Sequence, residues 1–187
     1  MTDDEWTIRL AQGEWFEENV TRPWLLKNRT SWWVTDTRNH LRRGGKGPRM
    51  AKGNDELVLP DFRLDDPETG RSSWLDSKVK SQPFRIDGQP GHLFYSLDPM
   101  GYQKYTKLMR IFKHMPMEIL MGCTETHILR LIDLRSAIPV MHEFNNQHVR
   151  YGRRLTPCFS TDQMQTVGLW SSKGMPRASI GLFAKPI

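Results

Sequence analysis

Two carboxylates and one amine lie within two short segments that both have the residue alternation of β-strands. Asp61 follows Pro60 in the first segment, and Asp76 and Lys78 lie in the second. Side chains along a strand alternate between its two faces, so Asp76 and Lys78 point in the same direction. Opposed carboxylates repel each other unless a cation binds between them, and hard oxygen ligands suit Mg²⁺ or Mn²⁺. These residue types could therefore support metal-assisted hydrolysis.

The segment between these residues predicts a hairpin that would position them. Strands are expected over 56–64 and 73–80, joined by the turn-forming residues 65–70. If the hairpin is symmetric about the bond between residues 68 and 69, Asp61 lies opposite Asp76. Directly opposed residues have Cβ atoms about 4.5 to 5.5 Å apart, which would let one cation contact both carboxylates.

A helix expected over about 3–21 supplies a third carboxylate. Acidic residues favour its N-terminus, and Pro23 is expected to break or kink it. Glu17 lies on an apolar or small-residue stripe, where an acid is costly unless it is paired or bound to a metal. We therefore expect Glu17 to face the hairpin, with a partly exposed position at the rim of the stripe as the alternative. The stripe comprises Trp6, Leu10, Gly13, Glu17, Val20 and, if it continues, Trp24.

The remaining pattern predicts a mixed α/β (α+β) fold. Residues 36–56 are expected to form a basic, Gly-rich loop. We expect residues 1–135 to form the core, and the weakly patterned residues 136–187 to form an extension that completes the same domain. The further predicted elements are a helix over about 99–113 and strands over 117–121 and 127–134.

The charge distribution favours a polyanionic partner. The chain has 187 residues, with 27 Lys and Arg against 21 Asp and Glu, and a formal net charge of +6. Basic residues concentrate within residues 27–53, where Asp36 is the only acid, and again at Arg150, Arg153 and Arg154. Segregated positive charge suits a nucleic acid, although basic loops that are merely solvated are the plain alternative.

Composition also bounds the cellular location. No apolar run approaches the roughly 18 residues that would span a bilayer, and the acidic N-terminus is unlike a signal peptide. The two cysteines, Cys123 and Cys158, form no disulfide framework. We therefore expect a soluble cytoplasmic protein with no membrane partner.

At the level of motifs, the chain resembles the PD-(D/E)XK nuclease superfamily over roughly residues 5–135. The motif is carried by Pro60-Asp61, a gap of 14 residues, and Asp76-Ser77-Lys78, preceded by the helix with Glu17. The resemblance implies a restriction-endonuclease-like α-β-β-β-α-β core, in which helices flank a central mixed sheet. It further implies a Mg²⁺ or Mn²⁺ cofactor.

The same resemblance implies roles for individual residues. Asp61 and Asp76 would hold the metal, with the Ser77 carbonyl as a further ligand and Glu17 as direct or water-mediated support. Lys78 would orient the attacking water or help to deprotonate it, and would offset charge in the transition state. The residues implied to be catalytic are thus Asp61, Asp76, Lys78 and Glu17.

Further residues are candidates for contact with the DNA backbone. Lys80 and Gln82 continue the strand beyond Lys78, although solvated strand ends are an equal alternative. Trp32 and Trp33 could stack on bases or form half-buried core. In the later helix, core packing is expected for Tyr102 and Tyr105, with Gln103 on the surface. The basic loop contributes Arg42, Arg43 and Lys46 as DNA-binding candidates.

These expectations combine into a metal-dependent deoxyribonuclease. We expect an endonuclease acting on structured or recombination and repair DNA, either similar to a Holliday-junction resolvase or a phage or mobile-element nuclease. A homodimer is compatible with this function, as is the cytoplasm of a bacterial or phage-infected host cell. The alternatives are a non-catalytic DNA-binding protein on the same fold, and an RNA-processing endonuclease.

Overall fold

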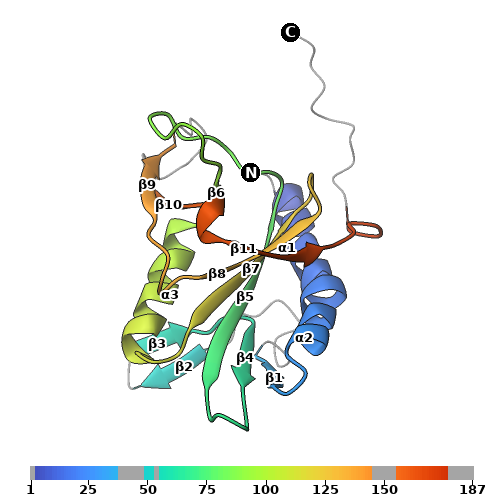
Figure 1. Ribbon diagram of the computed structural model, residues 1–187, viewed down its shortest axis with the longest axis vertical. Coiled ribbons are helices and arrows are strands. Elements are labelled where there is room, and N and C mark those ends of the chain that lie inside the picture. The colour runs from blue at the N-terminus through green and yellow to red at the C-terminus, as the bar shows by residue number, and fades with distance from the viewer. Residues whose placement is uncertain (1–2, 38–48, 53–54, 145–154, 177–187) are drawn as a thin grey trace.

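The computed structural model describes residues 3–37, 49–52, 55–144 and 155–176 (Figure 1). The N-terminal helical segment comprises α1 (Asp3–Phe16), a π-helical turn (Glu17–Thr21) and α2 (Arg22–Asn28). The strands and the remaining helices follow it along the chain. They are β1 (Trp33–Asp36), β2 (Arg49–Lys52), β3 (Asp55–Val58), β4 (Phe62–Asp65), β5 (Ser72–Lys80), β6 (Phe94–Ser96), α3 (Pro99–Ile111), β7 (Met117–Cys123), β8 (Ile128–Asp133), β9 (Val140–Glu143), β10 (Leu155–Ser160), a 3₁₀ turn (Thr161–Gln163) and β11 (Gln165–Leu169).

A six-stranded mixed sheet forms the centre of the described structure. Its strand order is β1-β4-β5-β7-β8-β11, and each neighbouring pair is antiparallel except β5 and β7, which are parallel. The connection between the two parallel strands contains α3. Figure 1 shows α1 and α2 on one side of this sheet and α3 on the other. The predicted mixed α+β fold with a central mixed sheet flanked by helices is therefore confirmed, and its order α1-β1-β4-β5-α3-β7 follows the α-β-β-β-α-β order.

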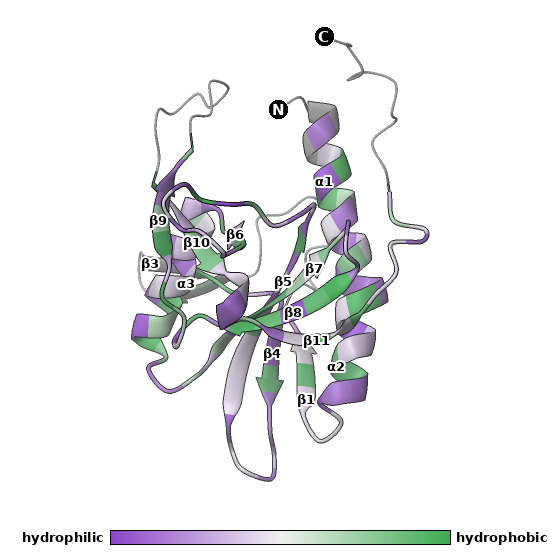
Figure 2. Cartoon of the chain, turned by 45° about the horizontal axis from the view of Figure 1, so that its top comes forward, coloured by the Kyte–Doolittle hydropathy of each residue, from purple (hydrophilic) through white to green (hydrophobic). Residues whose placement is uncertain are grey.

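The two faces of the sheet bury separate groups of apolar side chains, because successive residues of a strand point in opposite directions. On the α3 face, Trp74 and Ile119 pack in one cluster with Tyr105 of α3. On the opposite face, Leu75 and Leu120 pack against Leu25 of α2. Figure 2 shows the corresponding hydrophobic colouring on β7 and β8, and alternating hydrophilic and hydrophobic bands along α1.

Of the two outcomes predicted at Pro23, a break or a kink, the break is wrong, because the chain stays helical there. The chain passes from α1 through the π-helical turn directly into α2, where Pro23 occupies the first turn. A proline has no backbone N–H to donate to the preceding turn, and that turn here is the π-helical one, in which the Arg22 N–H bonds to the Glu17 carbonyl. The helix also approaches the sheet closely, because a Cβ atom added at Gly122 would lie 2.3 Å from Cε2 of Phe16.

The strand predicted over 56–64 is wrong in one respect, because it is two strands. β3 ends at Val58, β4 begins at Phe62, and β3 pairs with β2 in a separate two-stranded sheet. Pro60 lies between them, where a residue without an N–H would interrupt a strand ladder. The predicted loop over 36–56 is accordingly a β-hairpin over part of its length, and its residues 38–48 and 53–54 lie outside the described structure.

The later elements agree with the sequence more closely. The expected helix over 99–113 is α3, and the expected strands over 117–121 and 127–134 are β7 and β8, each end within two residues. Beyond residue 136, where the sequence is weakly patterned, β9 and β10 form a small sheet with β6, and β11 pairs with β8 at the edge of the main sheet. Across the described ranges, no helix has the length and apolar character needed to cross a membrane.

Candidate active site

The hairpin of β4 and β5 has the register predicted from its turn. Phe62 pairs with Leu75 and Asp65 pairs with Ser72, so the pairs are symmetric about the turn. Asp61 directly precedes the first of these pairs, and Asp76 directly follows it. The same register therefore continues to place the two aspartates opposite each other, at the end of β4 and in the middle of β5.

The backbone around Asp61 is held by contacts from both neighbouring strands. Oδ2 of Asp61 accepts a hydrogen bond of 2.9 Å from the backbone N–H of Ser77 on β5. On the other side, the Thr37 N–H donates to the Asp61 carbonyl over 3.0 Å, and the Thr37 hydroxyl donates to the Pro60 carbonyl. These bonds fix the short break between β3 and β4, so that the Asp61 carboxylate is directed at β5.

Asp76 is a buried carboxylate with two strong partners. Its residue exposure is 5 %. The hydroxyl of Tyr105 on α3 donates to Oδ2 of Asp76 over 2.7 Å, and the Lys78 ammonium forms an ion pair with the same oxygen. Asp76, Lys78 and Tyr105 thus form a charged cluster between β5 and α3.

Electrostatics keep Lys78 protonated in this cluster. Burial acts to lower the pKa of Lys78, but the charge of Asp76, supported by that of Asp61, outweighs it and raises that pKa well above its usual value. Burial, followed by the Asp76 charge, also raises the pKa of the Tyr105 phenol far above its usual range. Both groups therefore act as donors toward Asp76 at neutral pH.

Lys80 lies in a different electrostatic environment at the end of the same strand. Burial, followed by the Lys78 charge, lowers the pKa of Lys80 from 10.5 to about 8. A substantial share of Lys80 amines is therefore neutral under mildly alkaline conditions. This lysine, which was predicted to touch a phosphate backbone, is a weaker cationic anchor than an exposed lysine would be.

Glu17 is buried, as its place on the helical stripe predicts. It opens the π-helical turn that ends at Thr21, and the Ser77 hydroxyl donates to the Thr21 hydroxyl over 2.9 Å. Ser77 and Asp76 are consecutive in β5 and therefore point to opposite faces. Among the described residues, no group of three or more His, Cys, Asp or Glu side chains is arranged to hold a metal, so Glu17 does not join Asp61 and Asp76 in such a group.

The donors that are brought together suit a hard cation. Mg²⁺ is often bound through one or two carboxylates, with waters and substrate phosphates as the remaining ligands. Asp61 and Asp76 supply two carboxylates from adjacent strands, and the neighbouring Ser77 carbonyl is an oxygen ligand of the same kind. The residues present therefore fit Mg²⁺ or Mn²⁺ in their chemistry, with two carboxylates rather than three.

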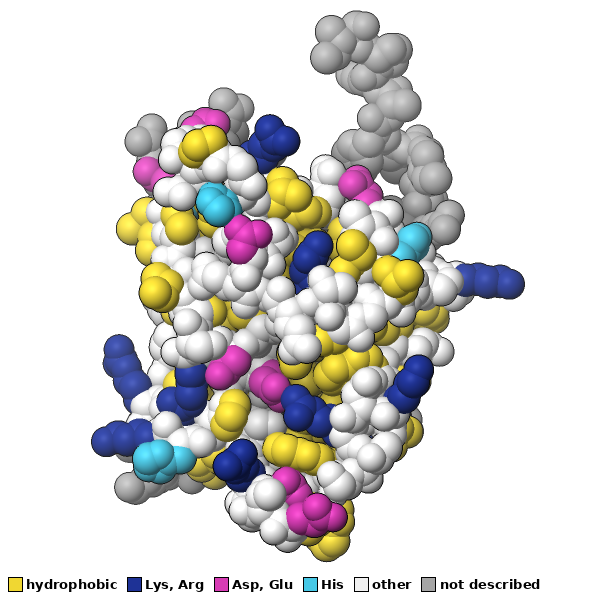
Figure 3. All heavy atoms as spheres, viewed as in Figure 1, with side chains coloured by type: hydrophobic (Ala, Val, Ile, Leu, Met, Phe, Trp, Pro, Cys, Tyr) yellow, Lys and Arg dark blue, Asp and Glu magenta, His cyan; other side chains and the backbone are white. Residues whose placement is uncertain are grey.

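The residues expected to contact DNA are only partly within the described structure. Lys80 is the last residue of β5 and is half-buried, whereas Gln82 lies beyond the strand and is exposed. Arg42, Arg43 and Lys46 lie outside the described residues. Figure 3 shows Lys and Arg side chains next to Asp and Glu side chains on the lower part of this face, so its described surface has mixed charge.

The two tryptophans after α2 lie in different environments. Trp33 on β1 is 73 % exposed. Trp32 is half-buried against the cluster around Leu25, and the Arg29 guanidinium carbon lies 5.2 Å from its ring centroid. Trp33 is therefore exposed enough to stack on a base, and Trp32 is placed as half-buried core.

Sequence reasoning missed two residues of the site. Tyr105 was expected only to pack in the core, and Thr37 had no predicted role. Tyr105 is buried as expected, while Tyr102 is half-buried and Gln103 is exposed. A polar tip on an otherwise buried aromatic was the available signal for Tyr105, since a buried phenol usually finds a hydrogen-bond partner.

Comparisons with known proteins give one distant likeness. No family model matches the chain, and no curated protein matches it. Among solved structures, the fold is similar to that of Hjc, a Holliday junction resolvase from Archaeoglobus fulgidus, with a TM-score of 0.41 and 8% sequence identity. The similarity covers 75% of this chain and 88% of that one. A likeness at this level assigns neither a family nor an activity to the chain.

Proposed function

We propose that the protein is a metal-dependent nuclease that hydrolyses phosphodiester bonds in DNA. The observation that carries the proposal is the arrangement of Asp61, Asp76 and Lys78. Two acids lie opposite each other on adjacent strands, and a lysine held as an ammonium lies beside one of them. The motif resembling the PD-(D/E)XK nucleases therefore coincides with a buried, organised site rather than with a solvated surface hairpin.

The residues of this site have separable roles in the proposed reaction. Asp61 and Asp76, with the Ser77 carbonyl, would hold Mg²⁺ or Mn²⁺, which polarises a phosphate and lowers the pKa of bound water. Lys78 would donate to a phosphate oxygen or orient the attacking water, and its raised pKa favours the role of a charged donor over that of a general base. Glu17 is proposed only as indirect support through water, because it does not form a group suited to a metal with Asp61 and Asp76.

We further propose an endonuclease that acts on structured DNA, such as recombination or repair intermediates. The net charge of +6 supports a polyanionic substrate. Four-way junctions belong among the tested substrates, since Hjc is a Holliday junction resolvase. A homodimer would place two such sites on two strands.

The test is a cleavage assay with the purified full chain and a panel of nucleic acids. Supercoiled plasmid, linear duplex, single strand, four-way junction and RNA are each incubated with Mg²⁺, Mn²⁺ or EDTA. Asp76→Asn and Lys78→Met should each lower metal-dependent cleavage by about 100-fold or more, as expected when a charged group at a reacting centre is removed. The matched controls, Asp87→Asn and Lys113→Met, replace exposed residues away from the site and should cleave like the parent protein.

Two checks keep the outcome interpretable. Circular dichroism establishes that each variant is folded, and DNA binding is measured in parallel by anisotropy. Folded Asp76→Asn protein that binds DNA without cutting it supports the proposal. Cleavage that survives EDTA, or that persists undiminished in both site variants, would overturn it.

A second candidate, a non-catalytic DNA-binding protein, is favoured by one observation. Oδ2 of Asp76 already accepts from Tyr105 and pairs with Lys78, and Glu17 does not join the two aspartates in a group suited to a metal. Under this alternative, binding would not respond to Mg²⁺, and no substrate would be cut. Cleavage of RNA alone would instead identify an RNA-processing endonuclease.

A further inference from the structure

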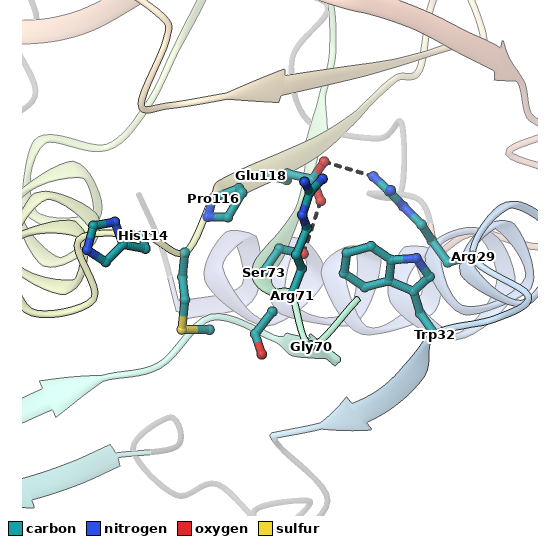
Figure 4. Close-up of a pocket in the computed structure, with 10 residues that line it drawn as sticks. Arg29, Trp32, Gly70, Arg71, Ser73, His114, Pro116 and Glu118 are labelled. Carbon is teal, nitrogen blue, oxygen red and sulfur yellow. Dashed lines mark hydrogen bonds and ion pairs between the residues drawn. The ribbon is translucent and has the colours of Figure 1, made fainter. Parts of the chain in front are cut away.

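A cavity of about 630 Å³ lies on the helix α2 side of the sheet, away from the Asp76 cluster. Its wall includes Arg29 and Trp32 after α2, Ser73 at the start of β5, and Glu118 on β7 (Figure 4). Ser73 is three positions before Asp76 in β5, so the two side chains point to opposite faces of the sheet. The volume lies within the range of roughly 300 to 1,000 Å³ that is typical of small-molecule sites.

The cavity has a positive balance of charge. Glu118 is its only acid among the described lining residues, and Oε1 of Glu118 is paired with the Arg29 guanidinium over 2.9 Å. Burial raises the pKa of Glu118, and the charge of Arg29 opposes that shift. Arg71 adds a second guanidinium and His114 an imidazole, and both belong to exposed residues at the rim. An anionic group would therefore be favoured near Arg71, whereas the His114 ring is turned away from it (Figure 4).

The wall of the cavity also carries a held aromatic ring. Trp32 packs against the buried cluster that contains Leu25 and Phe62, and Arg29 lies 5.2 Å from its ring centroid. Figure 4 shows the Trp32 ring, from the turn that leads into β1, beside Ser73 and Arg71. Because the Arg29 guanidinium lies over one face of the ring, a flat aromatic group would bind at its remaining exposed surface, without further ordering of the Trp32 side chain.

We propose that this cavity binds a single nucleotide unit, with the base against Trp32 and the phosphate at Arg71. The combination of a planar aromatic wall with a guanidinium donor matches the two halves of a nucleotide. Two sources share this chemistry, namely a free mononucleotide and an unpaired nucleotide at the end of a nucleic acid strand. The inference does not depend on hydrolysis at Asp76, and it would hold for a protein that only binds DNA.

The experiment follows the tryptophan indole N–H signals in two-dimensional NMR spectra of the full chain. The chain has seven tryptophans, and the signal that disappears in Trp32→Phe identifies Trp32. The ligands are the four ribonucleoside 5′-monophosphates, inorganic phosphate alone, and short single strands with and without a 5′-phosphate. A shift of the Trp32 signal with nucleotides or strands, but not with phosphate, is expected. The ligand that binds more tightly identifies the source.

Variants at the cavity test the assignment of each half of the ligand. Trp32→Leu, which keeps an apolar side chain, should weaken binding by about tenfold through loss of stacking. Arg71→Ala should weaken the binding of phosphorylated ligands by about tenfold through loss of a charge-assisted hydrogen bond. Arg85→Ala replaces an exposed arginine outside the cavity lining and should bind like the parent. Lys78→Met should also bind nucleotides at the cavity like the parent while losing DNA cleavage. Loss of nucleotide binding and loss of cleavage can therefore be told apart.

Three results would overturn the inference. The first is the absence of any Trp32 shift at about 10 mM nucleotide or strand, a concentration that would reveal even millimolar affinity. The second is phosphate binding as tight as nucleotide binding, which would make the cavity a simple anion site. The third is binding that is unchanged in both Trp32→Leu and Arg71→Ala.

Discussion

The hydroxyl of Tyr105 should contribute measurably to stability through its bond to Asp76. Tyr105 is 8 % exposed and Asp76 is 5 % exposed, and the O–H···O distance is 2.7 Å. Tyr105→Phe removes only the hydroxyl and leaves a buried carboxylate with one donor fewer. Hydrogen bonds to charged groups are typically worth about 1.5 to 3 kcal/mol. Because Lys78 still pairs with the same oxygen, we expect the lower part of this range, about 1.5 to 2 kcal/mol.

The assay is thermal and urea unfolding of the parent and the variant at neutral pH. For a domain of this size, the expected loss corresponds to a fall in Tm of about 3 to 8 °C. Tyr102→Phe is the matched control, since its half-buried ring packs on Phe159 at a centroid distance of 5.8 Å and its hydroxyl makes no hydrogen bond to another described residue. This control should change the free energy of unfolding by less than about 0.5 kcal/mol.

A double-mutant cycle decides whether the effect comes from the bond itself. In an Asp76→Ala background the Tyr105 hydroxyl has no carboxylate to bind, so the same Tyr105→Phe change should cost much less there. A coupling of about 1 kcal/mol or more is expected for two residues in direct contact. Equal losses in Tyr102→Phe and Tyr105→Phe, or a coupling near zero, would refute the assignment of Tyr105 as a support for Asp76.

Three further predictions concern packing and charge. Gly122→Ala should lower the free energy of unfolding by about 1 to 3 kcal/mol, because the new Cβ would clash with the fully buried ring of Phe16. Urea unfolding measures this loss. An unchanged urea midpoint would contradict the close approach of α1 to the sheet. Lys80 has a folded-state pKa of about 8 against 10.5 unfolded, so the unfolded chain holds more protons between these values and the free energy of unfolding rises with pH there. Lys80→Met should therefore be more stable than the parent at pH 7, by about 1 to 2 kcal/mol after allowance for partial exposure. This difference in the free energy of unfolding should vanish as the pH rises through this window. A variant less stable than the parent at pH 7 would show that Lys80 is not desolvated. Arg29→Met removes the partner of the Glu118 carboxylate and should cost about 2 kcal/mol by thermal unfolding, less at low pH where Glu118 is protonated, whereas a pH-independent cost would point to lost packing alone.

The sequence predicted the hairpin register because its determinants are local. The turn residues 65–70 fix where the chain reverses, and the alternation on either side then fixes which residues face each other. The same reasoning failed at Pro60, although a proline within a strand pattern already argues for an interruption. Asp61 therefore lies in the short segment between β3 and β4, just before the hairpin. There its carboxylate, in place of a backbone carbonyl, accepts the hydrogen bond from the Ser77 N–H.

The helical stripe that contains Glu17 ends in a feature that periodicity does not reveal. The stripe assumed 3.6 residues per turn throughout, whereas residues 17–21 form a π-helical turn with a wider hydrogen-bond span, which changes the spacing from Glu17 to the later stripe residues. Burial of Glu17 was correctly expected, but the close packing of α1 on the sheet at Gly122 was not. That packing is a long-range contact, and no local pattern in the sequence encodes it.

The parallel pairing of β5 with β7 has a consequence for how the protein folds. Trp74 pairs with Met117, and the whole α3 connection must close before any of these backbone bonds can form. Closing so long a segment costs entropy that local hairpins avoid, and it slows folding. Until β7 arrives, β5 is an open edge that could pair with another chain. Asp76 likewise has no Tyr105 beside it until α3 docks. Assembly of the charged cluster is therefore tied to a late step of folding, and a chain synthesised only as far as β5 would hold both aspartates without the arrangement that organises them.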